Sequence, residues 1–179
     1  MKIPFCPSGR SFRSAALVLT LAACGAAPAP APSKSFAELG IANGSSPMPA
    51  VHCSGQPTEA QFDALPSAGI TDVISLRPAN EPGTGWEEQR AAALGLRIVR
   101  IPVSGAADLT DDKVRALDEA LRASGGATLV CCGSSNRVGA LMALRARSIE
   151  KRSAEESLAI GKACGLTKLE PQVTELLRR

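Results

Sequence analysis

The sequence predicts an α/β domain built on a mostly parallel, four- to five-stranded sheet that is flanked by helices. Short apolar runs rich in β-branched residues alternate with helical patterns of about ten residues, and Gly or Pro separates most of them. Such alternation implies right-handed crossovers, which place parallel strands side by side and helices on both faces. A length of 179 residues suits one such domain with a full core.

Recognisable start and stop residues bound the elements of this domain. Thr58 is a good N-cap for a helix whose apolar face carries Phe62 and Leu65, and Gly69 ends it. Gly95 is the expected C-cap of the following helix. In order, the predicted elements are a strand over 50–53, the helix after Thr58, a strand over 72–76, a helix over 86–94, a strand over 97–103, a helix over 111–123, a strand over 127–131, and two or three helices after 137.

The N-terminus has the features of an export signal. A positively charged start precedes the apolar stretch 15–23, which is too short to be a membrane span. Residues 21–24, Leu-Ala-Ala-Cys, resemble the lipobox of bacterial lipoproteins. This resemblance implies that 1–23 is a lipoprotein signal peptide and that Cys24 becomes lipidated, so that the protein faces the periplasm and meets the membrane through its lipid anchor only. The alternative is a plain secretory signal cut near Ala23, with Cys24 left as a free thiol.

Residues 24–49 are predicted to be a spacer, because their Ala-Pro repeat is too poor in packing side chains to fold and favours polyproline II. The folded domain is then expected over 50–179, with ordered structure beginning near Ala50. In an exported protein the cysteines of this domain would meet an oxidising environment.

Composition narrows the chemistry of the domain. The net charge is only +3, aromatic residues make up 3% of the chain and Tyr is absent, so nucleic-acid binding is not expected. His52 is the single histidine, which argues against His-rich metal sites, and no metal or other cofactor is expected. Cysteine chemistry is the main possibility that remains.

One stretch, 129–140, carries recognisable reaction chemistry: it passes from an apolar strand through small polar residues into a helix. The amides of Gly133, Ser134 and Ser135 at the helix N-terminus could bind an oxyanion. A cysteine there would ionise more readily, and Arg137 could bind two anion oxygens at once. The alternative is an ordinary strand-to-helix connection with buried cysteines and a solvated arginine, and the spacing alone does not separate the two interpretations.

Neighbouring strand ends favour a site. In parallel sheets ligands bind beyond the carboxyl ends of the strands, and both Arg77 and the loop 104–110 follow such ends. The fold would therefore gather them beside 129–140. Glu87 and Glu88 are expected on the solvent face of the helix over 86–94.

From about Val51 to Arg147 the chain resembles the bacterial dual-specificity and tyrosine-phosphatase-like family that includes the phosphatase domain of beta-lactamase hydrolase-like proteins. The matching segments, in order, are 54–57 (Ser-Gly-Gln-Pro), 69–77 (Gly-Ile-Thr-Asp-Val-Ile-Ser-Leu-Arg), 100–103 (Arg-Ile-Pro-Val) and 130–140 (Val-Cys-Cys-Gly-Ser-Ser-Asn-Arg-Val-Gly-Ala).

The resemblance implies a phosphoric monoester hydrolase that acts through a phosphocysteine on a phosphorylated small molecule or protein. Cys132 is then the nucleophile and Arg137 the phosphate-binding arginine, with Asp108 the candidate general acid. The substrate-binding candidates are Gly133, Ser134, Ser135, Asn136 and Arg77.

Two residues depart from the pattern of this family. Cys131 stands where a histidine is usual, and Ser135 stands where a glycine is usual and a positive φ is expected, so activity could be reduced. Classical tyrosine phosphatases have five residues between Cys and Arg, a count that Cys131 would satisfy. Four residues, as after Cys132, also resemble the rhodanese sulfurtransferase loop. Two alternatives therefore remain: a sulfurtransferase, or an anion-binding module that has lost catalysis.

Overall fold

The computed structural model describes residues 1–2 and 31–178. The predicted signal peptide beyond residue 2, Cys24 and the first part of the predicted spacer lie outside the described residues. From residue 31 onward the chain forms one compact unit. Among the described residues, no helix combines the length and the apolar character needed to cross a membrane.

A five-stranded sheet in the order β1-β2-β5-β3-β4 forms the centre of the domain. Strands β2 (Val51–Ser54), β5 (Ala127–Cys131), β3 (Ile70–Ser75) and β4 (Arg97–Arg100) are parallel, and β1 (Ser45–Met48) joins the edge of β2 in the antiparallel direction. The predicted fold class is thus confirmed. Central β5 lies between β2 and β3, with Val130 opposite both Cys53 and Ile74.

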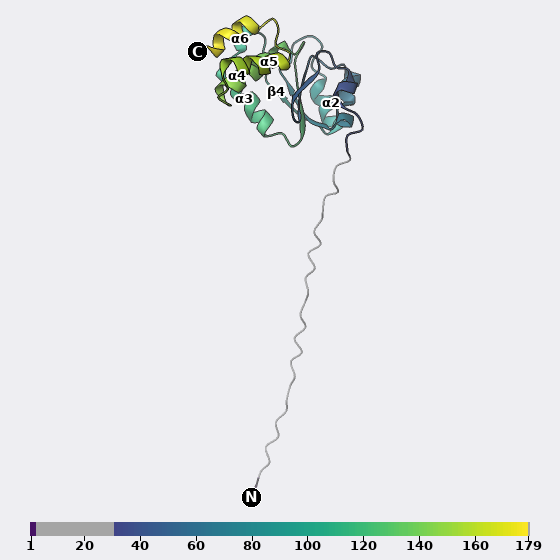
Figure 1. Cartoon of the computed structure of the whole chain (residues 1–179). Helices are drawn as coiled ribbons and strands as arrows, with labels where there is room; N and C mark the ends of the chain where they lie inside the picture. The colour runs from purple at the N-terminus through teal and green to yellow at the C-terminus, as the bar shows by residue number, and fades with distance from the viewer. Residues whose placement is uncertain (3–30, 179) are drawn as a thin grey trace. The chain divides into compact units, whose positions relative to one another are not determined.

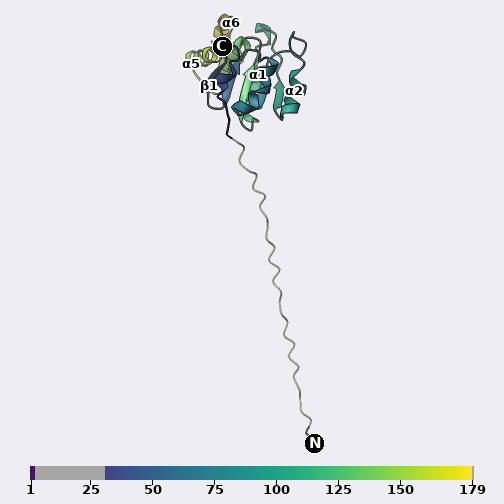
Figure 2. The ribbon, with the colours of Figure 1, turned by 90° about the vertical axis from the view of Figure 1, so that its right-hand side faces the viewer.

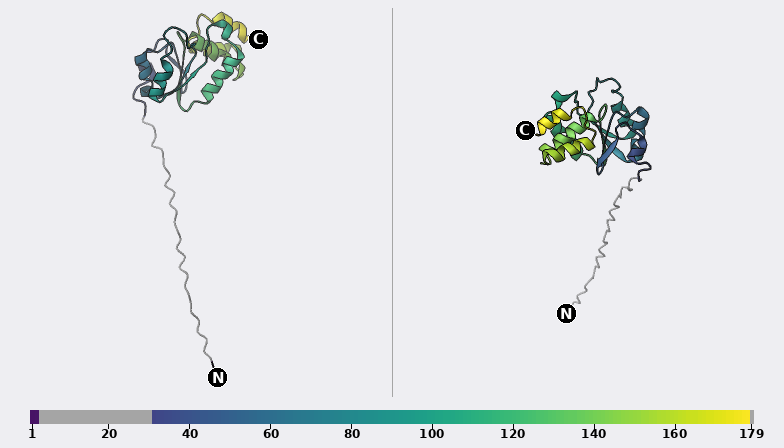
Figure 3. Two further views of the ribbon diagram at one scale, coloured as in Figure 1. Left: turned by 180° about the vertical axis from the view of Figure 1, so that it is seen from behind. Right: turned by 45° about the horizontal axis from the view of Figure 1, so that its top comes forward.

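Helices cover both faces of the sheet, and each side has its own apolar core (Figures 1 and 2). On one face pack the single turn η1 (Phe36–Leu39), α1 (Glu59–Asp63), η2 (Leu65–Ala68) and α2 (Glu87–Leu94). The other face carries α3 (Asp111–Arg122), α4 (Asn136–Ser148), α5 (Ala154–Ala163) and α6 (Glu170–Leu177), and Figure 3 shows this larger helical layer from two further directions. Between β4 and α3 lies one turn, η3 (Ala106–Asp108).

The predicted caps are confirmed. The Thr58 hydroxyl accepts a hydrogen bond from the Gln61 amide at the start of α1, in a full capping box. Gly95 ends α2 in the left-handed conformation at φ +70°. The strand predicted over 97–103 ends at Arg100, because Pro102 offers no amide. The chain beyond β4 still runs beside the end of β3. The amides of Ile101 and Val103 donate to the carbonyls of Ser75 and Leu76, each over 2.9 Å.

The prediction that order begins near Ala50 is wrong. A capping box between Ser35 and Glu38 starts η1, and β1 lies wholly within the predicted spacer. Phe36, Leu39 and Ile41 are buried in the core beneath α1 and η2. These three side chains supply the apolar surface that the Ala-Pro repeat before them lacks, so the folded domain extends about 15 residues further toward the N-terminus than expected.

Candidate active site

The segment from Cys132 to Arg137, here called the Cys–Arg loop, leaves the carboxyl end of β5 and enters α4 at Asn136. Neighbouring backbone holds it from one side. The Cys132 amide donates to the Ser54 carbonyl over 3.2 Å, and the Gly133 carbonyl accepts the Gln56 amide over 3.4 Å. The Ser134 carbonyl accepts from Asn43 Nδ2 over 3.3 Å. The carbonyls of Gly133 and Ser134 thus accept hydrogen bonds from residues that flank β2. The amides of these two residues can therefore face the opposite side.

Several of these amides are available to an anion. Within the part of the chain that the structure describes, no hydrogen-bond acceptor takes the amides of Gly133, Ser134 or Arg137. Gly133 and Ser134 are also exposed, so an anion can approach from solvent. These N–H groups lie at the N-terminus of a 13-residue helix, where the helix dipole adds to their attraction for negative charge.

The two adjacent cysteines lie on opposite faces of the sheet, as the alternation of a strand requires. Cys132 belongs to the core formed with α4 and α5, whereas Cys131 packs in the other core with α1 and α2. Burial raises the pKa of the Cys131 thiol, and the nearby negative charge of Glu87 raises it further. Cys131 is therefore unsuited to be a thiolate nucleophile, and it points away from Arg137.

Arg137 reaches back from the first turn of α4 and is held in one orientation. Its Nη1 and Nη2 atoms donate to the two carboxylate oxygens of Glu81 over 2.8 and 2.9 Å, and Nη1 also donates to the Val103 carbonyl over 2.7 Å. A guanidinium has five N–H donors, so three are used and the pair on the Nε–Nη2 edge remains. The Cys132 sulfur also lies within hydrogen-bonding reach of this guanidinium. The remaining edge can therefore bind two oxygens of an anion at the nucleophile.

Glu81 is a site residue that the sequence analysis missed. It lies in the Gly/Pro loop after β3, and its carboxylate also accepts from Arg77 Nε over 2.8 Å. The hydrogen bond from Arg137, with help from Arg77, lowers the pKa of Glu81 to about 2. In return, Glu81 raises the pKa of Arg137. The one available signal was the spacing of Arg77 and Glu81, four residues apart in an otherwise irregular loop.

We expect Glu81→Gln to destabilise the protein at neutral pH but not in strong acid. Because the folded-state pKa of about 2 lies below the ordinary value of 4.5, the carboxylate stabilises the fold above pH 4.5. This stabilisation is lost as the pH falls toward 2. Thermal unfolding from pH 7 down to pH 2 should show a difference in Tm between the two proteins that shrinks below about pH 4.5. Glu59→Gln, at an exposed ion pair, is the matched control and should show little difference. A constant difference for Glu81→Gln across this range would contradict the assignment.

Arg77 is buried, and its donors hold the Glu81 loop. Besides Glu81, they reach the carbonyls of Pro82 and of Gly83. Arg77 thus positions Glu81, which positions Arg137. A direct contact between Arg77 and a substrate remains a prediction.

Ser135 adopts the positive φ that the sequence analysis expected at this position, with φ +64°. For a residue other than glycine this backbone conformation is strained. Its buried hydroxyl offsets the strain by donating to the Cys164 carbonyl over 2.9 Å, which ties the Cys–Arg loop to the end of α5. Gly165 makes room for this contact, because a Cβ atom there would lie 2.6 Å from the Ser135 Cβ.

Of the remaining predicted residues, Asn136 has a structural task and Asp108 lies in the adjoining loop. Asn136 Oδ1 accepts the amides of Thr167 and Leu169 and so fixes the segment between α5 and α6. The Asp108 carboxylate accepts the Ser104 amide over 2.7 Å. This loop follows Val103, whose carbonyl binds Arg137, so it lies next to the site. A catalytic role for Asp108 remains a prediction.

The expectation that Glu87 faces solvent is wrong, because this side chain is 1% exposed. Its carboxylate accepts hydrogen bonds from Gln56 Nε2, over 2.8 Å, and from Arg100 Nη2. Arg100 also donates to the Ser75 hydroxyl and the Arg77 carbonyl. This polar network lies under the site on the Cys131 side and joins the carboxyl ends of β2, β3 and β4.

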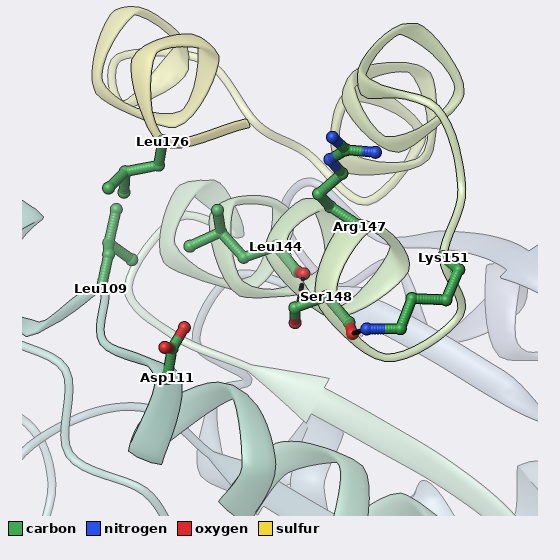
Figure 4. A pocket seen from close by; sticks show the side chains of 7 residues that line it. All are labelled: Leu109, Asp111, Leu144, Arg147, Ser148, Lys151 and Leu176. Atoms are coloured by element: carbon green, nitrogen blue, oxygen red, sulfur yellow. Dashed lines mark hydrogen bonds between the residues drawn. The ribbon is translucent and has the colours of Figure 1, made fainter. Parts of the chain in front are cut away.

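A separate surface pocket of about 670 Å³ lies toward the other end of α4 (Figure 4). Leu109, Leu144 and Leu176 form its apolar part, and Arg147 and Lys151 its basic part. Both cations already bind carbonyls near the C-terminus of α4: Arg147 donates to Arg152, and Lys151 to Ser148. No cysteine lines this pocket, so its basic groups serve the helix end and the Cys–Arg loop remains the candidate site.

The mostly parallel sheet and the Cys–Arg loop at a helix N-terminus define an α/β domain whose candidate site combines a cysteine, an arginine and open backbone amides. A comparison with family models assigns it further. Residues 47–148 match the family described as "Beta-lactamase hydrolase-like protein, phosphatase-like domain". The chain belongs to this family.

Curated relatives are similar to the chain over part of their length. A beta-lactamase hydrolase-like protein of Xylella fastidiosa is 32% identical over 116 residues, which cover 63% of this chain and 27% of that protein. A protein of the same description from Agrobacterium fabrum is 32% identical over 95 residues, which cover 51% of this chain and 22% of the relative. The chain thus spans about a quarter of the length of these relatives.

Solved structures share the fold. A Shewanella putrefaciens structure described as a phosphatase superposes with a TM-score of 0.62 at 24% identity, covering 80% of this chain and 92% of that one. A Neisseria meningitidis structure, likewise described as a phosphatase, gives 0.61 at 20% identity, with 72% and 94% covered. The catalytic domain of a yeast PP-IP phosphatase gives 0.57 at 17% identity, with 76% and 86% covered.

Proposed function

We propose that this domain is a cysteine-dependent phosphatase that hydrolyses phosphate monoesters. Cys132 attacks phosphorus, the P–O bond to the leaving group breaks, and a phosphocysteine forms that water then hydrolyses. The observation that carries the proposal is the Arg137 guanidinium, fixed by Glu81 and Val103 with one two-donor edge left over at the Cys132 sulfur.

The other parts of the site fit the same chemistry. The open amides of Gly133 and Ser134 would stabilise the equatorial oxygens as their charge grows in the transition state. Asp108, on the loop beside Arg137, would protonate the leaving oxygen. The family includes phosphatase-like domains, and one structural neighbour, Pseudomonas aeruginosa TpbA, was solved with phosphotyrosine. These points support a phosphorylated protein or small molecule as the substrate.

A sulfurtransferase is the second candidate, and the loop length favours it specifically. Four residues separate Cys132 from Arg137, as in the rhodanese loop, and such a site would carry a persulfide on Cys132. Reduced protein should therefore be tested in two assays: release of phosphate from an aryl phosphate, and formation of thiocyanate from thiosulfate and cyanide. We expect phosphate release without thiocyanate. Thiocyanate without phosphate would replace the proposal, and vanadate binding without either activity would indicate an anion-binding module.

We further propose that the protein is exported and anchored in a bacterial membrane, facing the periplasm, through a lipid on Cys24. The support is the sequence pattern of residues 1–24. In a bacterial host, metabolic labelling with a fatty acid should mark the wild type and place it in the membrane fraction. Cys24→Ser should lose the label and leave that fraction, whereas Cys53→Ser is the matched control and should keep both. Unlabelled wild-type protein would contradict the anchor.

A further inference from the structure

Three buried thiols gather on the α4–α5 face of the sheet. Cys53 of β2 and Cys164 after α5 are both fully buried in the core that also contains Cys132. The thiols of Cys53 and Cys164 lie within hydrogen-bonding reach of one another, and Cys132 is near enough to Cys53 for a charge interaction. All of these cysteines are free thiols in the structure. Cys53 and Cys164 are therefore the two thiols of this cluster with the strongest mutual interaction.

The pair connects two elements that hold the Cys–Arg loop. Cys53 lies opposite Val130 in the register of β2 and β5, two residues before Cys132. The Cys164 carbonyl accepts the hydrogen bond from Ser135. A covalent bond between the two sulfurs would fasten α5 to the sheet directly beneath the loop, and it would enclose more than half of the chain in one covalent ring.

We propose that Cys53 and Cys164 form a disulfide when the chain folds in an oxidising environment, and that Cys131 and Cys132 remain thiols. Cys131 lies on the opposite face of the sheet, out of reach of the pair. Joining the two sulfurs also consumes the other two thiols of this core, so that Cys132 keeps no partner there for a disulfide of its own.

The bond forms during folding, before the pair is enclosed. In the folded domain both thiols are inaccessible, and the adjacent Cys164 thiol together with burial raises the pKa of Cys53, so the reactive thiolate is scarce. In the unfolded chain the Cys53 thiolate attacks a small disulfide such as oxidised glutathione and releases one glutathione thiol. The Cys164 thiolate then attacks the Cys53 sulfur and releases the second. Two protein thiols are thereby oxidised, and one glutathione disulfide is reduced to two thiols.

Refolding the full chain in two buffers tests the proposal. Denatured, reduced protein is refolded either in a mixture of oxidised and reduced glutathione or in reductant alone. It is then denatured, alkylated and analysed by peptide mass spectrometry. We expect a Cys53–Cys164 peptide only from the glutathione mixture, with Cys131 and Cys132 fully alkylated. The Tm should rise by about 10 °C, the order expected for a covalent loop of this length.

Variants and alternative products make the test decisive. Cys53→Ala and Cys164→Ser should each abolish the linked peptide and the rise in Tm, whereas Cys131→Ser should change neither. A Cys53–Cys132 or Cys132–Cys164 peptide, or full alkylation of Cys53 and Cys164 after oxidative refolding, would overturn the proposal. None of these measurements depends on catalysis, so their outcome is independent of the proposed phosphatase activity.

Discussion

Replacing Cys132 by serine should lower aryl-phosphate hydrolysis by a factor of about 10³ or more, while Cys131→Ser should keep the rate within about tenfold of wild type. A serine hydroxyl is far less acidic than a thiol, so it stays protonated and is a far poorer nucleophile than a thiolate. Cys131 faces the other core beside Glu87, where its loss touches no group of the Cys–Arg loop. Initial rates in reducing buffer measure both effects.

Thermal unfolding and vanadate binding, measured on these variants and on Arg137→Lys, show whether a substitution changes the fold or the chemistry. Cys132→Ser should keep the wild-type Tm and still bind vanadate through the loop amides and Arg137. Arg137→Lys should lose both vanadate affinity and rate, by about 10²-fold, because an ammonium cannot replace a two-donor edge and cannot hold Glu81 at two points. Activity that survives in Cys132→Ser but disappears in Cys131→Ser would show that Cys131 is the nucleophile.

Gly139→Ala should be the most destabilising single methyl addition in the domain. Its Cβ would lie 2.2 Å from the Leu166 amide nitrogen and 2.5 Å from the Gly161 carbonyl oxygen, where α4 and α5 touch backbone to backbone. Because neither group is the end of a flexible side chain, the helices must separate, at a cost of about 3 kcal/mol or more. We expect thermal unfolding to show a Tm lower by roughly 10 °C.

Alanine substitutions at two further glycines serve as comparisons for the loss of stability in Gly139→Ala. Gly125→Ala adds the same methyl group where nothing lies within 4 Å, and it should leave the Tm nearly unchanged. If Gly139→Ala does not fold at all, Gly161→Ala is the milder test, with closest contacts of 2.8 Å in the same crossing. Equal Tm values for Gly139→Ala and Gly125→Ala would contradict the close packing of α4 on α5.

The elements that the sequence predicted correctly are those whose signals are local. Strand β5 has its predicted bounds, because five apolar or β-branched residues follow a Gly pair that can only be a turn. The choice of Cys132 and Arg137 as the reacting pair came from the family resemblance, since spacing alone does not separate Cys132 from Cys131, and it stays a prediction. Strand β1 was missed because Ser45–Met48 carries no β-branched residue, and it is a strand only through its pairing with β2.

The missed side chains depend on partners that are distant in the sequence. Glu87 has the spacing of a surface position on α2, but Arg100 at the end of β4 and Gln56 just after β2 satisfy its charge in the core. Glu81 lies 56 residues from Arg137, in a loop whose Gly and Pro content predicts only exposure. No local sequence pattern predicts hydrogen bonds between side chains that lie so far apart in the chain. By contrast, the positive φ of Ser135 followed from its position in the family motif.

The two outer strands of the sheet also determine how the molecule behaves at high concentration. An unpaired strand edge is a template for pairing with another chain, which leads to aggregation. Strand β1 is only four residues long and contains Pro47, which offers no amide for such pairing. At the opposite edge, β4 begins and ends with arginine, and Pro102 follows two residues later. Both edges therefore discourage the growth of the sheet into a neighbouring molecule, and the domain should stay dispersed when many copies are crowded together.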